Sequence, residues 1–238
     1  MILGMSTVRF IQVFVVQLGV GLFFLYVAYK ILKRDTKRLN RLISYYFVAV
    51  AAAMFVNVIY APLNHERIVE LMHILTISLL CFGFVFLIVF NYVLLLSEQV
   101  FSPKRQNLSI LGYAILIGGL FLIPGGVNIG DETGWSPEWS IWFLLYVFII
   151  VLGISFTYFI RSSQNLYKQF EESEMKRKWR YYQIGTTSAY IGLIGTSISN
   201  YLGIAEFRTI WAGVSFLLFL FTTWAIYNGV ARQMEAKD

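Results

Sequence analysis

The chain has 238 residues, of which 58% are hydrophobic and only 13% are charged, and its formal net charge is +6. Soluble domains carry about 25% charged residues, so this composition excludes a water-soluble enzyme, a disordered chain and a small disulfide-rich scaffold. The one cysteine, Cys81, lies in an apolar run, so no disulfide can form within the chain. We therefore expect a protein built for a lipid bilayer.

Seven apolar runs follow one another along the chain, each near the length of about 20 residues that a helix needs to cross a bilayer. They are about twice as long as barrel strands and lack strict apolar–polar alternation, which favours helices. The sixth run is the least apolar, because it is rich in Gly, Ser and Thr. The predicted fold is an all-α membrane protein, one seven-transmembrane helix bundle over 1–238, with spans at about 8–32, 42–62, 67–96, 108–125, 139–161, 182–202 and 206–230.

The basic residues predict the orientation of these helices. All but three of the 19 Lys and Arg residues fall in alternate connections or after the last run, and the exceptions are Arg9, Arg67 and Arg208. Because short cytoplasmic loops carry an excess of Lys and Arg, we expect the N-terminus outside and the C-terminus cytoplasmic, in a multi-pass protein of the cell membrane. The positive charge is then an orientation signal rather than a nucleic-acid-binding surface.

Two connections are longer than the others. The turn-rich segment PGGVNIGDETGWSPEWS (124–140) is expected either to cover the outer end of the bundle or to form a solvated connector. Segment 162–181 is predicted to extend the fifth and sixth helices into the cytoplasm, because Glu172 and Glu174 stand four residues before Lys176 and Lys178. This segment and the C-terminal tail are candidate surfaces for a cytoplasmic signalling partner, and attraction to anionic lipid is the alternative.

Aromatic residues cluster where two of the predicted helices enter the membrane. Amphipathic rings favour the level of the lipid headgroups. We therefore expect that level for two groups of side chains, Trp135, Trp139 and Trp142 outside and Trp179, Tyr181 and Tyr182 inside.

Charged residues occur only near the ends of the runs, which disfavours a proton pump, a voltage sensor and an ion-coupled transporter. Near the outer end, Glu70 and His73 share a helix face, and Arg208 enters the last run from the same side. With Trp142 they are the candidate ligand-binding residues, and His73 is a candidate pH sensor. The alternative is a structural ion pair between two helices. Two histidines do not furnish a metal or haem site, so no cofactor is expected.

Uncharged polar residues within the runs have two interpretations, hydrogen bonding between helices or lining a ligand cavity. They are Gln12, Gln17, Asn57, Asn91, Tyr146 and Asn200. In the sixth run, small or polar residues recur every four positions, which is typical of close helix packing, either within the bundle or in a homodimer. These helix-packing candidates are Ser188, Gly192, Thr196 and Asn200.

The sequence carries no nucleophile elbow, zinc motif or glycine-rich phosphate loop, so we do not expect an enzyme. Segment 206–230 contains no lysine to hold retinal, which excludes a retinal pigment of the microbial type.

Two basic stretches, KRDTKRLNR (33–41) and KRKWRYYQIG (176–185), resemble the seven-transmembrane N-terminal sensor region of prokaryotic histidine kinases. The resemblance implies a prokaryotic, non-catalytic sensor or receptor-like protein that passes a stimulus to a cytoplasmic partner. In that family the seventh helix leads into a PAS or kinase domain, whereas this chain ends at Asp238. We therefore expect an excised sensor region or a relative that signals through another protein. Alternatives from other classes are an accessory subunit of a larger membrane complex and a small-solute carrier.

Overall fold

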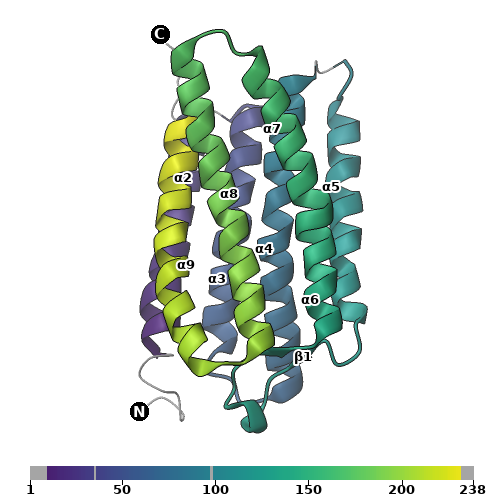
Figure 1. Cartoon of the computed structure of the whole chain (residues 1–238), viewed down its shortest axis with the longest axis vertical. Helices are drawn as coiled ribbons and strands as arrows, with labels where there is room; N and C mark the ends of the chain where they lie inside the picture. The colour runs from purple at the N-terminus through teal and green to yellow at the C-terminus, as the bar shows by residue number, and fades with distance from the viewer. Residues whose placement is uncertain (1–9, 35, 97–98, 232–238) are drawn as a thin grey trace.

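The computed structural model describes residues 10–34, 36–96 and 99–231, and these residues form seven helical rods (Figure 1). Three of the rods contain a π-helical stretch, and one ends in a 3-10 turn. The rods are η1–α2 (Ile11–Gln17 and Leu18–Arg34), α3 (Arg38–Tyr60), α4 (Glu66–Leu95), α5–η2 (Pro103–Gly118 and Gly119–Leu122), α6–η4–α7 (Ile141–Phe148, Ile149–Phe156 and Thr157–Gln169), α8 (Ser173–Leu202) and α9–η5 (Ala205–Ile226 and Tyr227–Ala231).

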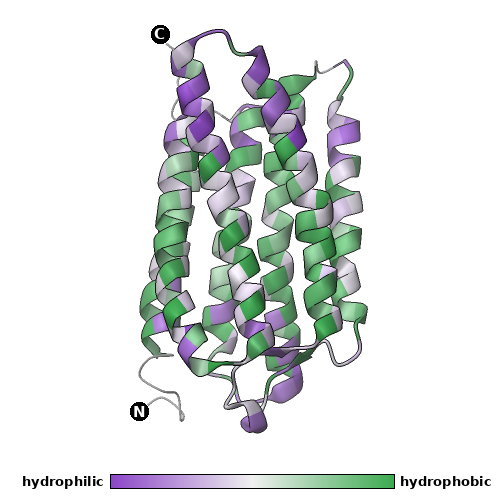
Figure 2. Ribbon diagram, viewed as in Figure 1, coloured by the Kyte–Doolittle hydropathy of each residue, from purple (hydrophilic) through white to green (hydrophobic). Residues whose placement is uncertain are grey.

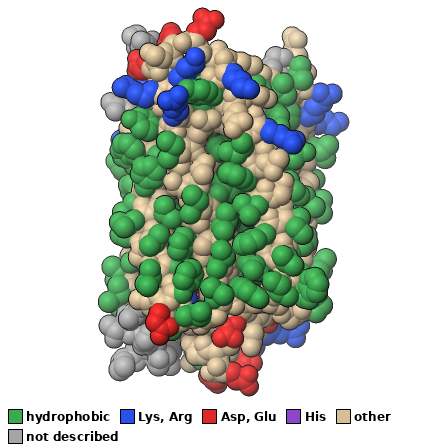
Figure 3. Space-filling view, in the orientation of Figure 1, with side chains coloured by type: hydrophobic (Ala, Val, Ile, Leu, Met, Phe, Trp, Pro, Cys, Tyr) green, Lys and Arg blue, Asp and Glu red, His purple; other side chains and the backbone are tan. Residues whose placement is uncertain are grey.

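Six of these rods, all except α8, are long and apolar enough to cross a membrane. Hydrophobic residues predominate along the middle of the helices (Figure 2), and large hydrophobic side chains are exposed across the middle of the face in Figure 3, where a bilayer would cover them. The prediction of an all-α membrane bundle is therefore confirmed. Helix α8 is less apolar because it carries charged residues near its start and many small residues, yet it runs alongside the other helices over the height of the bundle.

The two ends of the bundle differ in chemistry. We call the end with the α2–α3, α4–α5 and α7–α8 connections the basic end, because Lys and Arg gather there (upper end in Figure 3). The opposite end is the hairpin end, where strand β1 (Val127–Asn128) pairs antiparallel with β2 (Glu138–Trp139). Val127 pairs with Trp139 and Asn128 with Glu138, and the 3-10 turn η3 (Asp131–Thr133) lies between the strands. The basic half and the hairpin half are the parts of the bundle nearest these ends.

Helix α4 forms the centre of the core and packs against α3, α5 and α7. In the basic half, α4, α7 and α8 are joined through buried polar groups. Asn91 donates from Nδ2 to Ser162 Oγ (3.1 Å) and accepts at Oδ1 from the Tyr182 hydroxyl (2.8 Å), while Trp179 Nε1 donates to the Ser163 carbonyl (2.9 Å). Aromatic rings fill the space around these bonds, so this half is closely packed.

The predicted extension of the fifth and sixth helices is confirmed, because α7 continues to Gln169 and α8 begins at Ser173. Glu174 and Lys178 form the predicted ion pair, with Oε1 and Nζ 2.6 Å apart. The fifth span is predicted at about 139–161, and its helix begins slightly later, because Trp139 belongs to β2. Helix α6 starts at Ile141, where the Ser140 hydroxyl caps the helix by accepting from the Phe143 amide (3.3 Å).

The headgroup level predicted for Trp139, Trp179 and Tyr182 stays a prediction, but these side chains face the protein interior rather than lipid. Each of these side chains is buried, with at most 4% of its surface exposed. Their polar atoms find partners inside the protein, so they do not need the water–lipid interface. Three of the six aromatic residues of the two predicted groups are therefore part of the protein core.

Helices α8 and α9 pack closely at several small residues. Thr222 Oγ1 donates to the Gly185 carbonyl (3.1 Å), and Trp211 Nε1 donates to Thr196 Oγ1 (3.1 Å). Gly192 faces Phe219 with room to spare, whereas Ser188 bonds to the Ile184 carbonyl of its own helix. Packing of this face within the bundle therefore occurs through α9. A homodimer remains a prediction.

Candidate functional site

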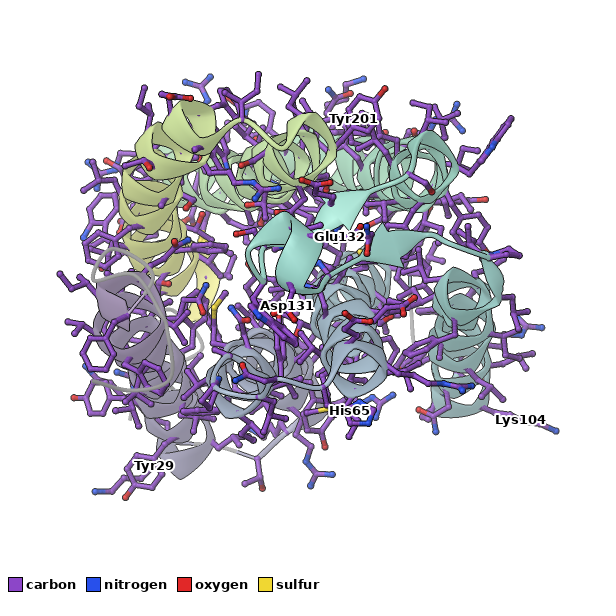
Figure 4. The ribbon with its side chains drawn as sticks, turned by 90° about the horizontal axis from the view of Figure 1, so that it is seen from below. Tyr29, His65, Lys104, Asp131, Glu132 and Tyr201 are labelled. Carbon is purple, nitrogen blue, oxygen red and sulfur yellow. The ribbon has the colours of Figure 1, made fainter. Side chains whose placement is uncertain are left out.

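A cavity of about 520 Å³ lies in the hairpin half, lined by residues of η1, α2, α3, α4, α8, α9 and the β1–β2 hairpin. This volume falls in the range of about 300–1,000 Å³ that is typical of small-molecule sites. Figure 4 shows this end of the bundle from below, with the hairpin residues Asp131 and Glu132 lying across it.

The hairpin covers the cavity and supplies part of its wall through Ile129 and the segment 134–137. The hairpin is internally fixed, because its strands pair and Trp135 Nε1 donates to Asp131 Oδ1 (2.8 Å). Ile129 is buried against the helices beneath. Of the two predictions for segment 124–140, a cover over one end of the bundle is the one that the structure shows.

His73 joins this cover to the helices. Trp139 Nε1 of β2 lies 2.9 Å from His73 Nε2, and the Tyr60 hydroxyl of α3 lies 2.9 Å from His73 Nδ1. An indole N–H only donates, so His73 Nε2 accepts and its proton resides on Nδ1. A protonated ring would direct a second N–H at the indole N–H. The arrangement therefore suits a neutral His73 and gives no support to its predicted role as a pH sensor.

Arg208, in the first turn of α9, makes the second attachment of the cover. Its Nη2 donates to the Pro137 carbonyl (2.7 Å), and its Nε is buried without a hydrogen-bond partner. Arg208 lines the cavity, and so does His73. The cover is thus bonded to α4 on one side and to α9 on the other.

The four predicted ligand-binding residues do not lie together in the structure. His73 and Arg208 reach the cavity from α4 and α9. Glu70 is partly exposed on α4 and does not belong to the cavity wall. Trp142 is 71% exposed on α6, where it faces away from the protein interior. The site proposed below therefore contains His73 and Arg208 alone of these four.

Both interpretations of the uncharged polar residues apply. Gln12, Gln17, Asn57 and Asn200 line the cavity. Asn57 Nδ2 also donates to Gln17 Oε1, so this pair bonds two helices while facing the cavity. Asn91 instead belongs to the buried network of the basic half, and the Tyr146 hydroxyl donates to the Leu116 carbonyl (2.8 Å).

Sequence reasoning missed the cavity-lining rings of Phe216 and Phe219, and it missed two rings there that carry a polar group, Tyr60 and Trp211. The last two follow a pattern. Each stands three residues after a polar residue that also lines the cavity, Asn57 and Arg208 respectively. This spacing places the members of each pair on one helix face. It was the signal in the sequence that would have found them.

The wall offers hydrogen bonds, aromatic surface and one formal charge. Within the part of the chain that the structure describes, no three His, Cys, Asp or Glu side chains gather as metal ligands do. The wall can therefore bind and orient a small molecule through the groups described above. Comparisons of the chain with models of protein families, with curated proteins and with solved structures gave no match.

Proposed function

We propose that this chain is a non-catalytic receptor of the cell membrane, which binds a small molecule in the hairpin-half cavity and passes the event to the basic end. The cavity carries the proposal, because its size and mixed wall are those of a small-molecule site. The proposed topology has seven spans with the hairpin end outside. It is supported by the gathering of Lys and Arg at the other end.

The attachment of α9 supports a transmitting role for this helix. Its four buried residues, Thr222, Thr223, Ala225 and Ile226, all lie near the basic end. At that end Lys30 stands over the ring of Tyr227, 5.0 Å from its centre, and Arg34 donates to the Tyr227 hydroxyl. Nearer the hairpin, α9 borders the cavity. A ligand can therefore bias the outer part of α9 while its inner part stays in contact with α2 and α8.

The resemblance to histidine kinase sensor regions suggests the output. The partner in this proposal is a cytoplasmic signalling protein that contacts segment 162–181, where α7 and α8 project at the basic end. Because α8 packs along α9, a shift of α9 reaches this segment directly. A solute carrier would need a path through the basic half, which the rings around Asn91 fill in this structure.

Topology is the first test. In a Cys81→Ser background, Glu132→Cys on the hairpin and Lys104→Cys at the basic end (both labelled in Figure 4) are exposed to a membrane-impermeant maleimide. We expect Glu132→Cys to react in intact cells and Lys104→Cys only after permeabilisation. The reverse pattern would overturn the proposed orientation.

Coupling is the second test, and it uses a side chain that fills the cavity. Ala212→Trp adds bulk at the cavity wall, whereas Val214→Trp adds it at an exposed position of the same helix. Spin-label distances are measured in nanodiscs between Ile210→Cys and Ile68→Cys near the hairpin end, and between Lys104→Cys and Glu171→Cys at the basic end. We expect Ala212→Trp to change both distances by about 1–2 Å, the size of helix shifts in switching proteins, and Val214→Trp to change neither.

If Ala212→Trp leaves the spin-label distance at the basic end unchanged, the receptor proposal is wrong. Uptake of small solutes by vesicles containing the purified protein would also remove it, in favour of a carrier. Isolation of the chain in a fixed-stoichiometry membrane complex, with both distances insensitive to Ala212→Trp, would favour an accessory subunit.

A further inference from the structure

The charge of the cavity wall is strongly one-sided. Among the described residues that line it, Arg208 is the only Lys or Arg, and none is Asp or Glu. His73 also lines the wall, but its bonds to Trp139 and Tyr60 suit the neutral ring. The remaining polar groups are amides, hydroxyls and indoles. A cationic ligand would find no counter-charge here, whereas an anionic ligand would find one.

The guanidinium of Arg208 is not fully used by the protein. Among the described residues, Arg208 donates only from Nη2, to the Pro137 carbonyl, and its Nε is buried without an acceptor. Glu138 is the nearest carboxylate that acts on Arg208 electrostatically, but the two side chains form no ion pair within 4 Å. A guanidinium presents its N–H groups as a fork that fits the two oxygens of a carboxylate. A ligand carboxylate in the cavity would therefore accept from guanidinium N–H groups that the Pro137 carbonyl does not occupy.

The far part of the cavity is apolar. Its wall there is formed by Val20, Met54, Ile77, Leu80, Phe216 and Phe219. Along α9, Phe219 follows Arg208 by eleven residues, which corresponds to about 16 Å of helix. The charged group thus lies at one end of the cavity and apolar side chains lie at the other, which matches a molecule with one charged end and one apolar end.

We infer that the ligand is a single-chain amphiphile, a medium-length hydrocarbon with one carboxylate that binds Arg208. The inference rests on the proposed function and names the ligand class of the same site. The carboxylate competes with the Pro137 carbonyl for Arg208, so its binding alters the contact between the hairpin and α9. The hydrocarbon lies against Phe216 and Phe219 and transfers apolar surface out of water.

The test compares probes with the same length of hydrocarbon chain and an anionic, neutral or cationic head group. It uses the full chain in nanodiscs of zwitterionic lipid. Decanoate, decanol and decylammonium are titrated, and the thermal midpoint of unfolding and the spin-label distances described above are recorded. We expect decanoate to raise the midpoint and shift both distances, and the other two probes to act at least about tenfold more weakly. Butyrate, which lacks the hydrocarbon length, should act as weakly as decanol.

Variants assign the effect to the arginine. Arg208→Gln should weaken decanoate binding about tenfold or more, and Arg208→Lys, which keeps the charge but loses the fork, should have an intermediate effect. Arg67→Gln removes an exposed cation at the same end, outside the cavity wall, and should leave binding unchanged. This control separates binding at Arg208 from charge-dependent partition into the lipid.

The failures of the two proposals are distinguishable. If decanol or decylammonium binds as well as decanoate, the ligand class is wrong and the receptor proposal stands. If Arg208→Gln and Arg67→Gln have equal effects, the assignment to Arg208 is wrong. If no probe binds and Ala212→Trp also leaves the basic-end distance unchanged, both the ligand class and the receptor proposal fall.

Discussion

The basic half and the hairpin half are built from the same helical rods but are packed differently. In the basic half, Asn91, Ser162 and Tyr182 bond across three helices, and aromatic rings fill the space between them. In the hairpin half, comparable polar side chains such as Asn57 and Asn200 face a cavity. The difference shows that polar residues within membrane helices serve two purposes here, to join helices in one half and to line a site in the other.

Helices α4 and α9 show the same contrast. Helix α4 is buried along most of its length and holds the core together. Helix α9 is buried only near the basic end. Regions with few buried contacts open at lower free energy than the core, so the part of α9 near the hairpin end should move at the lowest cost in free energy.

The largest expected effect comes from truncating a phenylalanine in each half. Phe159→Ala removes a fully buried ring of the basic half and should lower the free energy of unfolding by about 3–5 kcal/mol. Phe216→Ala removes a half-buried ring at the cavity wall and should cost less than about 1 kcal/mol. Reversible unfolding in mixed micelles measures both, and equal losses would show that the halves are packed alike.

Adding one methyl group to a glycine should give the next largest effect. A Cβ at Gly229 would lie 2.6 Å from the backbone nitrogen of Tyr182, so Gly229→Ala should destabilise by about 1–3 kcal/mol. A Cβ at Gly192 would meet only Phe219, at an ordinary 4.0 Å, so Gly192→Ala should stabilise by up to about 1 kcal/mol through helix propensity. The same unfolding measurement serves here. A stable Gly229→Ala would contradict the close contact of η5 with α8.

The smallest expected effect distinguishes two asparagines. Asn91→Ala removes the short bond from the Tyr182 hydroxyl in a closed interior and leaves it only the 3.4 Å bond to the Leu87 carbonyl, so it should cost about 1–2 kcal/mol. Asn57→Ala removes a bond to Gln17 at the cavity wall and should change stability by less than about 0.5 kcal/mol, because the polar cavity has room for water. A larger loss for Asn57→Ala than for Asn91→Ala would mean that the cavity wall, not the basic half, depends on its polar bonds.

Much of the fold was predictable from the sequence, because a helix that crosses a bilayer needs a long apolar run whatever its neighbours are. The runs therefore located the helices to within a few residues in most cases. The sixth run was the hardest to assign, since its apolar character is diluted by residues such as Gly185 and Thr196 that suit close packing against α9. The same small and polar residues lower the hydropathy of this run and allow its close packing.

The candidate site was predictable only in part. Arg208 and His73 stood out because ionisable groups near the membrane are costly and rare, and both line the cavity. Glu70 met the same criterion and Trp142 was chosen as an aromatic residue near the same end, but neither lines the cavity. Trp139 was assigned to a helix although it lies in a strand. Helical spacing and charge locate a residue along its own helix. They do not reveal which neighbouring helix it will face.

Composition and the placement of Lys and Arg by themselves determined that the chain forms an apolar helical bundle with one basic end, because each property depends only on local sequence. The cavity, its cover and the incomplete bonding of Arg208 were decided by tertiary structure. They depend on how η1, α4, α9 and the hairpin, which are distant along the chain, fill or fail to fill the space between them. That packing is a property of many side chains together, so no single stretch of sequence encodes it.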